Sequence, residues 1–132
     1  ILASGRPSVS FEVFPPKTDK GLDKLNATLG DLYRWSPDYV SCTYGAGGTA
    51  KGYNLEICRS IADSGRTMPL SHYTCVHHTR EQIRADMDEY LQMGVDHFLA
   101  LRGDFAPGEN ATNGDFDHAT QLIEYMRRSG QI

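Results

Sequence analysis

Short apolar runs alternate along the chain with longer segments in which apolar residues recur every three or four positions. The short runs are typical of buried strands, and the longer segments are typical of amphipathic helices. The expected strands are Val9–Phe14, Tyr39–Thr43, Met68–Cys75 and His97–Leu101. The expected helices are Asp19–Arg34, Tyr53–Ser64, the segment between Thr79 and Gly94, and Asp117–Ser129. Four successive βα units predict a parallel sheet with right-handed crossovers.

Each expected helix has one apolar stripe at helical spacing. The stripes consist of Leu22, Leu25, Leu29 and Leu32; Leu55, Cys58, Ile61 and Ala62; Ile83, Met87, Tyr90 and Leu91; and Ala119, Leu122, Ile123 and Met126. Thr79 and Gln82 have the spacing of a capping box, which predicts a helix start at that point. The stripes therefore predict which side of each helix packs against the sheet.

The number of units bears on whether the sheet is open or closed. A (β/α)8 TIM barrel needs about 250 residues, so four units make half of one. No Gly-x-Gly-x-x-Gly pattern follows the first strand, as it would in a dinucleotide-binding open sheet. The chain begins at Ile1 without Met and ends at Ile132, where a fifth strand is expected. We therefore expect residues 1–132 to be the N-terminal half of one barrel domain, truncated at both ends.

Composition and charge exclude several classes of function. The 132 residues are 39% hydrophobic, and the formal net charge is −4, with the basic residues scattered. Nucleic-acid and membrane-surface binding need clustered Lys and Arg, so neither is expected. No apolar run approaches the roughly 20 residues of a membrane span. We expect a cytoplasmic protein in which Cys42, Cys58 and Cys75 are reduced and buried.

Two acidic residues stand on or directly after expected strands. Glu12 lies within the first strand, and the apolar run Leu99–Leu101 leads into Arg102, Gly103 and Asp104. The carboxyl ends of parallel strands are where α/β barrels bind and transform ligands. Glu12 and Asp104 are therefore candidates for one shared site. The alternative for Glu12 is a structural ion pair with a lysine or arginine inside the barrel.

Four motifs in succession resemble one known family. They are Ser10–Lys17 (SFEVFPPK), Val40–Ala46 (VSCTYGA), His72–Cys75 (HYTC) and Ala100–Gly108 (ALRGDFAPG). In order and spacing they resemble methylenetetrahydrofolate reductases across nearly the whole chain. The resemblance implies a barrel that contains FAD and reduces 5,10-methylenetetrahydrofolate to 5-methyltetrahydrofolate. The hydride would come from NAD(P)H through the flavin.

The resemblance also implies roles for the two acids. Glu12 corresponds to the general acid, and the apolar neighbours Phe11, Val13 and Phe14 would help it to hold a proton. Asp104 corresponds to the aspartate between flavin and folate, where a negative charge stabilises a cationic form of the folate. Both residues are therefore expected to be catalytic and to bind substrate.

Further positions correspond to flavin contacts of the family. Hydroxyl groups can bond the flavin edges, a glycine lets the backbone approach closely, and a guanidinium can bind phosphate. The expected contacts are Thr43, Tyr44, Ala46, His72, Leu101, Arg102, Gly103, Asp104 and Ala119. The family usually has tyrosine at the position of His118. This difference bears on the expected contact with the adenine end of the flavin.

Other possibilities remain open at this point. Cys75, His77 and His78 lack a second ligand pair at a zinc-site interval, so we expect no metal. Alternatives to the reductase are a non-catalytic folate- or flavin-binding half-barrel and a related reductase with another electron donor. Half of a barrel would leave unpaired strand edges, so we also expect a homo-oligomer.

Overall fold

The computed structural model describes residues 3, 5–44 and 51–130. Its strands are β1 (Ser10–Val13), β2 (Tyr39–Cys42), β3 (Met68–Thr74) and β4 (Phe98–Leu101). Its helices are α1 (Asp19–Leu32), α2 (Lys51–Ser64), α3 (Arg80–Gln92) and α4 (Ala119–Arg128), and a short 3-10 helix, η2 (Tyr33–Trp35), follows α1. The predicted succession of strands and helices is confirmed, with ends that differ by at most two residues.

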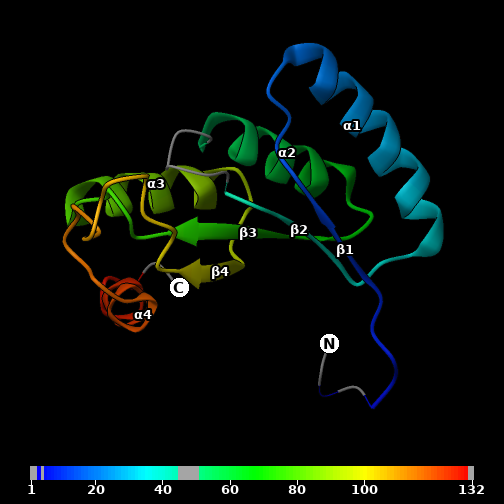
Figure 1. Ribbon diagram of the computed structural model, residues 1–132. Helices are drawn as coiled ribbons and strands as arrows, with labels where there is room; N and C mark the ends of the chain where they lie inside the picture. The colour runs from blue at the N-terminus through cyan, green and yellow to red at the C-terminus, as the bar shows by residue number, and fades with distance from the viewer. Residues whose placement is uncertain (1–2, 4, 45–50, 131–132) are drawn as a thin grey trace.

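The four strands form one sheet in the order β1-β2-β3-β4, and all neighbouring pairs are parallel (Figure 1). The register places Glu12 beside Ser41 and places His72 beside Leu99. All four carboxyl ends lie at one edge of the sheet because the strands run the same way. This arrangement is that of half an α/β barrel, and the barrel is not closed within the described residues.

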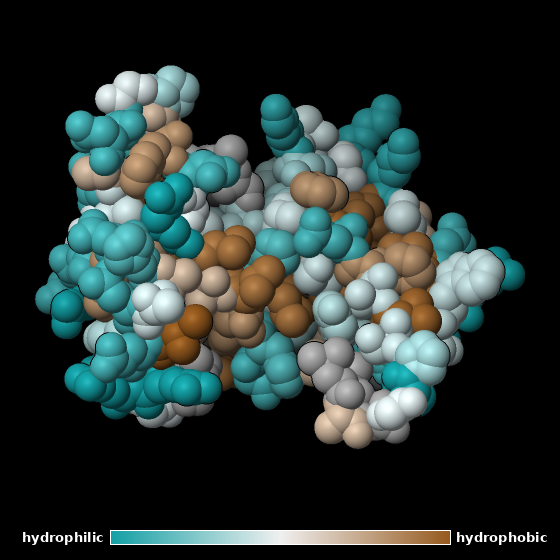
Figure 2. All heavy atoms as spheres, turned by 60° about the horizontal axis from the view of Figure 1, so that its bottom comes forward, coloured by the Kyte–Doolittle hydropathy of each residue, from teal (hydrophilic) through white to brown (hydrophobic). Residues whose placement is uncertain are grey.

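The two faces of the sheet differ because successive strand residues point to opposite sides. Val40 and Tyr73 point toward the face covered by α1, α2 and α3, and both are fully buried in the core. The other face is open, and it presents Phe14, Leu99 and Leu101 as exposed apolar side chains. Figure 2, which turns this face forward, shows apolar surface gathered in its middle.

Helix ends follow local chemistry. The side chain of Thr18 accepts from the backbone N–H of Gly21 at the start of α1. The predicted capping box of Thr79 and Gln82 is confirmed at the start of α3. The α1 helix ends at Leu32 because the chain tightens into η2 before Pro37. A residue that precedes proline is kept out of the helical conformation.

The helix stripes are confirmed in their centres and wrong in places at their margins. Leu122 and Met126 are fully buried on α4, whereas Ile123 is 37% exposed. One residue along a helix is a turn of about 100°, which rotates Ile123 out of the packed face. Apolar spacing also missed two buried polar residues, Asn54 on α2 and Asp86 on α3.

The three cysteines match the expectation: Cys42, Cys58 and Cys75 are free and buried. Each lies on or next to an element of the core, where a small thiol packs as an apolar group. None of the helices described in residues 3, 5–44 and 51–130 is long and apolar enough to cross a membrane.

Candidate active site

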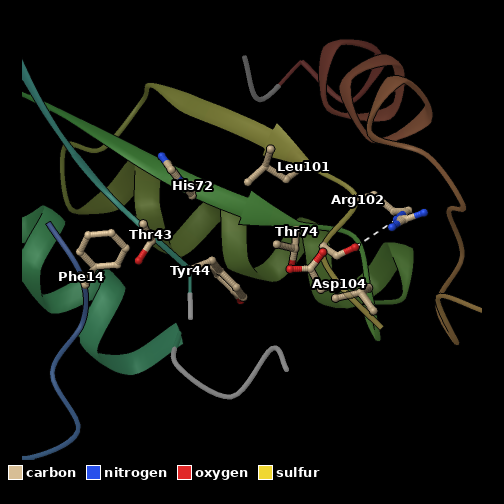
Figure 3. A pocket seen from close by; sticks show the side chains of 10 residues that line it. Phe14, Thr43, Tyr44, His72, Thr74, Leu101, Arg102 and Asp104 are labelled. Atoms are coloured by element: carbon tan, nitrogen blue, oxygen red, sulfur yellow. Dashed lines mark hydrogen bonds between the residues drawn. The ribbon is translucent and has the colours of Figure 1, made fainter. Parts of the chain in front are cut away.

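A cavity of about 660 Å³ opens at the carboxyl ends of the strands, on the open face of the sheet (Figure 3). Its wall contains residues from the ends of all four strands. This is the edge at which barrels of this kind bind ligands. The lining residues are Phe14, Thr43, Tyr44, His72, Thr74, Val76, Leu101, Arg102, Gly103 and Asp104.

The structure brings together most of the residues that the sequence singled out. Seven of them line the cavity: Thr43, Tyr44, His72, Leu101, Arg102, Gly103 and Asp104. Glu12 is not among the lining residues, but it contacts His72, which lines the cavity. Ala119 begins α4 and is not among the lining residues. Ala46 lies outside the described residues.

Glu12 and His72 form a pair on the open face of the sheet. Oε2 of Glu12 lies 3.4 Å from Nε2 of His72, and the Glu12 side chain is about half exposed. The side chain that contacts Glu12 is therefore a histidine, not the lysine or arginine of the structural alternative. The expected apolar enclosure by Phe11 and Val13 is wrong, because strand alternation turns both toward the helix-covered face.

Burial lowers the pKa of His72 below its ordinary value, and the neighbouring Glu12 opposes part of this effect. His72 is therefore neutral at neutral pH. Its Nε2–H can then donate to the Glu12 carboxylate, which orients the acid beside the cavity.

His72 should make the folded state sensitive to acid. The unfolded chain has the ordinary histidine pKa of about 6.5 and binds a proton more readily than the folded state does. The contribution of His72 to the free energy of unfolding is fully present above pH 6.5. It is lost as the pH falls through the lower pKa that His72 has in the folded state. We expect His72→Gln to reduce the loss of stability between pH 7 and pH 5, measured by urea denaturation.

His97→Gln is the matched control for this experiment, because the His97 side chain is half exposed and its Nδ1 lies 2.6 Å from the neighbouring Asp96 carboxylate. We expect the control to keep the acid sensitivity that His72 confers. An unchanged pH dependence in His72→Gln would show that burial does not disfavour the charged form of this histidine.

The loop after β4 combines a cation, a glycine and an acid. The Nε–H of Arg102 donates to the carbonyl of Gly103, and its guanidinium lies over the ring of Phe105 at 4.5 Å. Gly103 has φ +90, and a Cβ there would lie 2.5 Å from Cγ1 of Val76, so only glycine fits. This tight turn brings Asp104 into the cavity wall as an exposed carboxylate.

The hydroxyl of Tyr44 contacts another side chain of the protein. It lies 3.3 Å from Nε2 of His78, while Tyr44 itself lines the cavity. Nδ1 of His78 is 2.7 Å from the carbonyl of Val76, and Tyr73 donates to Asp86 at 2.6 Å. Burial raises the pKa of Tyr44 and of Tyr73. The cluster fixes the Tyr44 ring in the wall of the cavity.

The histidines considered for zinc contact different groups. His77 lies 3.1 Å from Glu109, whereas His78 contacts Tyr44. Within residues 3, 5–44 and 51–130, no group of three or more His, Cys, Asp or Glu side chains is placed to hold a metal ion.

Thr43 is positioned by a buried amide that the sequence did not single out. Nδ2 of Asn54 donates to the carbonyls of Cys42 and Thr43, each at 3.0 Å. Oδ1 of Asn54 accepts from Ser71 at 2.8 Å and from Tyr90 at 2.6 Å. Asn54 thereby holds the end of β2 against α2 and α3. It also fixes the position of Thr43 in the wall of the cavity.

Three lining residues were missed: Phe14, Thr74 and Val76. The signal that could have found two of them is strand alternation. Phe14 follows Glu12 by two residues, and Thr74 follows His72 by two, so each shares a face with a predicted site residue.

Comparison with known proteins identifies the family of this chain. A family model described as methylenetetrahydrofolate reductase matches residues 1–132. A Pectobacterium carotovorum subsp. carotovorum protein named 5,10-methylenetetrahydrofolate reductase is 36% identical over 128 residues, which cover 97% of this chain and 42% of that protein.

Two eukaryotic relatives show a similar level of identity. An Oryza sativa subsp. japonica protein named probable methylenetetrahydrofolate reductase (NADH) is 33% identical over 95% of this chain and 22% of its own length. A Schizosaccharomyces pombe protein named methylenetetrahydrofolate reductase 1 is 33% identical over 89% of this chain and 20% of its own length. This chain thus spans from 20% to 42% of these relatives. The chain belongs to the methylenetetrahydrofolate reductase family.

Proposed function

We propose that the full-length protein containing this chain reduces 5,10-methylenetetrahydrofolate to 5-methyltetrahydrofolate, with FAD as its cofactor and NAD(P)H as the hydride source. The cavity at the strand ends carries this proposal, because seven residues that resemble the family's flavin and folate contacts line it together. The names of the relatives support the same reaction class, and the name of the rice protein includes NADH.

The size and lining of the cavity fit the ring system of a flavin. Ligand cavities usually measure about 300–1,000 Å³, and this one is about 660 Å³. Phe14 and Leu101 offer apolar surface, whereas Thr43, His72 and Asp104 offer polar groups. A planar ring with apolar faces and polar edges needs both kinds of contact. Ala119, which was expected to contact the flavin, lies outside this wall.

The chemistry that a bound FAD supplies is hydride transfer between the nicotinamide and the folate. Asp104 places a negative charge beside this reaction and would stabilise the cationic folate that accepts the hydride. Arg102 forms no salt bridge among the ion pairs found within the described residues. Its outer N–H groups are therefore suited to a phosphate or a ring oxygen of the cofactor.

Glu12 would deliver the proton that opens the methylene bridge of the folate. The Glu12 carboxyl group lies 3.4 Å from His72, which lines the cavity. Because His72 is neutral, it can accept from a protonated Glu12 in one tautomer and donate to the carboxylate in the other. The pair can therefore keep the acid in place before and after proton transfer.

The proposal is tested on the purified full-length protein. We expect it to carry FAD, identified after heat release by its absorption and chromatography, and to form 5-methyltetrahydrofolate with NADH or NADPH. Absence of flavin would contradict the proposal. Bound flavin or folate without turnover would favour the binding module, and turnover only with another donor would favour the related reductase.

Asp104→Asn should slow folate reduction and raise the midpoint potential of the bound flavin, because a nearby negative charge disfavours reduction. The fold should persist, since Asp104 is exposed. A redox titration measures the midpoint. Asp96→Asn is the control, because this exposed carboxylate precedes the amino end of β4, away from the cavity. An unchanged or lower midpoint in Asp104→Asn would contradict the assigned electrostatic role.

We further propose that the protein is cytoplasmic and forms a homo-oligomer. The open sheet face supports association of residues 1–132 on their own, because Leu99 and Leu101 are exposed on β4, an edge strand of the described sheet. Sedimentation velocity at micromolar concentration measures the oligomeric state of residues 1–132 and of the full-length protein.

A further inference from the structure

Thr74 is the last residue of β3, and its hydroxyl stands out among the buried polar groups. The residue is 7% exposed. Among the side chains described in residues 3, 5–44 and 51–130, Oγ1 of Thr74 is the buried polar atom without a hydrogen-bond partner. Folded proteins bond nearly all such groups, because burial of an unbonded hydroxyl destabilises the folded state.

The position of Thr74 links this hydroxyl to the cavity. Thr74 lines the wall between His72 and the loop of Gly103 and Asp104 (Figure 3). It shares the open face of the sheet with His72, two residues earlier on β3. Its partner across the β3–β4 ladder is Leu101, whose side chain is 37% exposed. Because Leu101 is partly exposed, its side chain can change rotamer beside Thr74 when a ligand enters the cavity.

Folding alone does not account for a hydroxyl at this site. Valine has the same branched shape and an equal preference for strands, and it would fill the position without burying an unbonded polar atom. A stability cost that folding does not require is typical of residues that serve a ligand.

We propose that the hydroxyl of Thr74 is a ligand-binding group that bonds a polar ring edge of the flavin in this cavity. This inference rests on the proposed function and adds a contact that neither the sequence motifs nor the relatives' names assign. A threonine hydroxyl can donate to a ring carbonyl or nitrogen and can accept from a ring N–H. Binding would thus supply the partner that the hydroxyl lacks in the protein alone.

The proposal predicts opposite effects of Thr74→Val on stability and on binding. Without flavin, removal of the unbonded hydroxyl should raise Tm by about 2–4 °C. With flavin, loss of one hydrogen bond should weaken binding, with Kd rising about 3- to 10-fold. Thr74→Ser keeps the hydroxyl and loses a methyl group, so it should retain the wild-type Kd at a lower Tm.

The experiment uses full-length protein from which flavin has been removed, with thermal unfolding for Tm and FAD titration by fluorescence for Kd. Thr67→Val is the matched control. Its hydroxyl donates to the carbonyl of Pro37 at 2.8 Å, at the other end of β3. Removal of a bonded hydroxyl outside the cavity should lower Tm and leave Kd unchanged.

A higher Tm with a weaker Kd in Thr74→Val, together with a wild-type Kd in Thr74→Ser, supports the proposal. A lower Tm in Thr74→Val overturns it, because the hydroxyl would then have a partner in the free protein. An unchanged Kd in Thr74→Val, when the wild type binds FAD, overturns the role of Thr74 alone. Failure of the wild type to bind FAD overturns both this inference and the proposed function.

Discussion

Glu12→Gln in the full-length protein is expected to lower the rate of folate reduction by about 10²- to 10⁴-fold, the usual contribution of a general acid. Glutamine has nearly the same shape and can keep the contact with His72, so the change removes the transferable proton and little else. Reduction of the flavin by the nicotinamide needs no proton from Glu12. That half-reaction should therefore keep its wild-type rate.

Anaerobic stopped-flow spectroscopy separates the two half-reactions, because flavin absorbance falls when NAD(P)H reduces it and returns when the folate is reduced. Glu81→Gln on α3 is the control, since Glu81 is exposed in the first turn of that helix and outside the cavity wall. Wild-type folate reduction by Glu12→Gln would remove Glu12 from the mechanism. Equal slowing of both half-reactions would indicate a role in flavin binding instead.

The fold was largely predictable because its signals are local. Apolar spacing alone places α1 through Leu22 and Leu29, and capping chemistry places the start of α3 at Thr79. Parallel pairing then follows from the order of strands and helices. The clustering of candidate residues was also predictable, since parallel strands bring their carboxyl ends to one edge, where Asp104 and His72 line one cavity.

The direction of individual side chains was less predictable, because distant parts of the chain decide it. The hydroxyl of Tyr44 turns to His78, 34 residues away in sequence. Glu12 lies among apolar neighbours in sequence, yet Phe11 and Val13 point to the other face of the sheet. Sequence proximity along a strand does not mean a shared environment, since the faces alternate.

Buried polar residues were missed for a related reason. Apolar stripes predict which face of a helix is packed, but they give no position to a polar residue on that face. Asn54 is fully buried, and its hydroxyl partner Tyr90 is 36 residues away. Asp86 is buried next to the hydroxyl of Tyr73, 13 residues earlier. Such residues can be identified as buried only from the folded structure, which shows their hydrogen-bond partners.

Asn54→Ala is expected to lower the free energy of unfolding by about 3–5 kcal/mol, a loss typical of a broken buried hydrogen-bond network. The change removes the donor to the carbonyls of Cys42 and Thr43 and the acceptor for Ser71 and Tyr90. All of these groups would stay buried, and alanine offers them no partner. Urea denaturation of the full-length protein measures the change.

Asn26→Ala is the matched control on α1. Asn26 is exposed and accepts one hydrogen bond, from Ser60 at 3.3 Å, so its removal should change stability by less than about 0.5 kcal/mol. Because Asn54 also holds the end of β2 at the cavity, Asn54→Ala should weaken FAD binding, whereas Asn26→Ala should not. A loss below about 1 kcal/mol in Asn54→Ala would show that water satisfies the freed groups, and the amide would then not be what holds Thr43 in the wall.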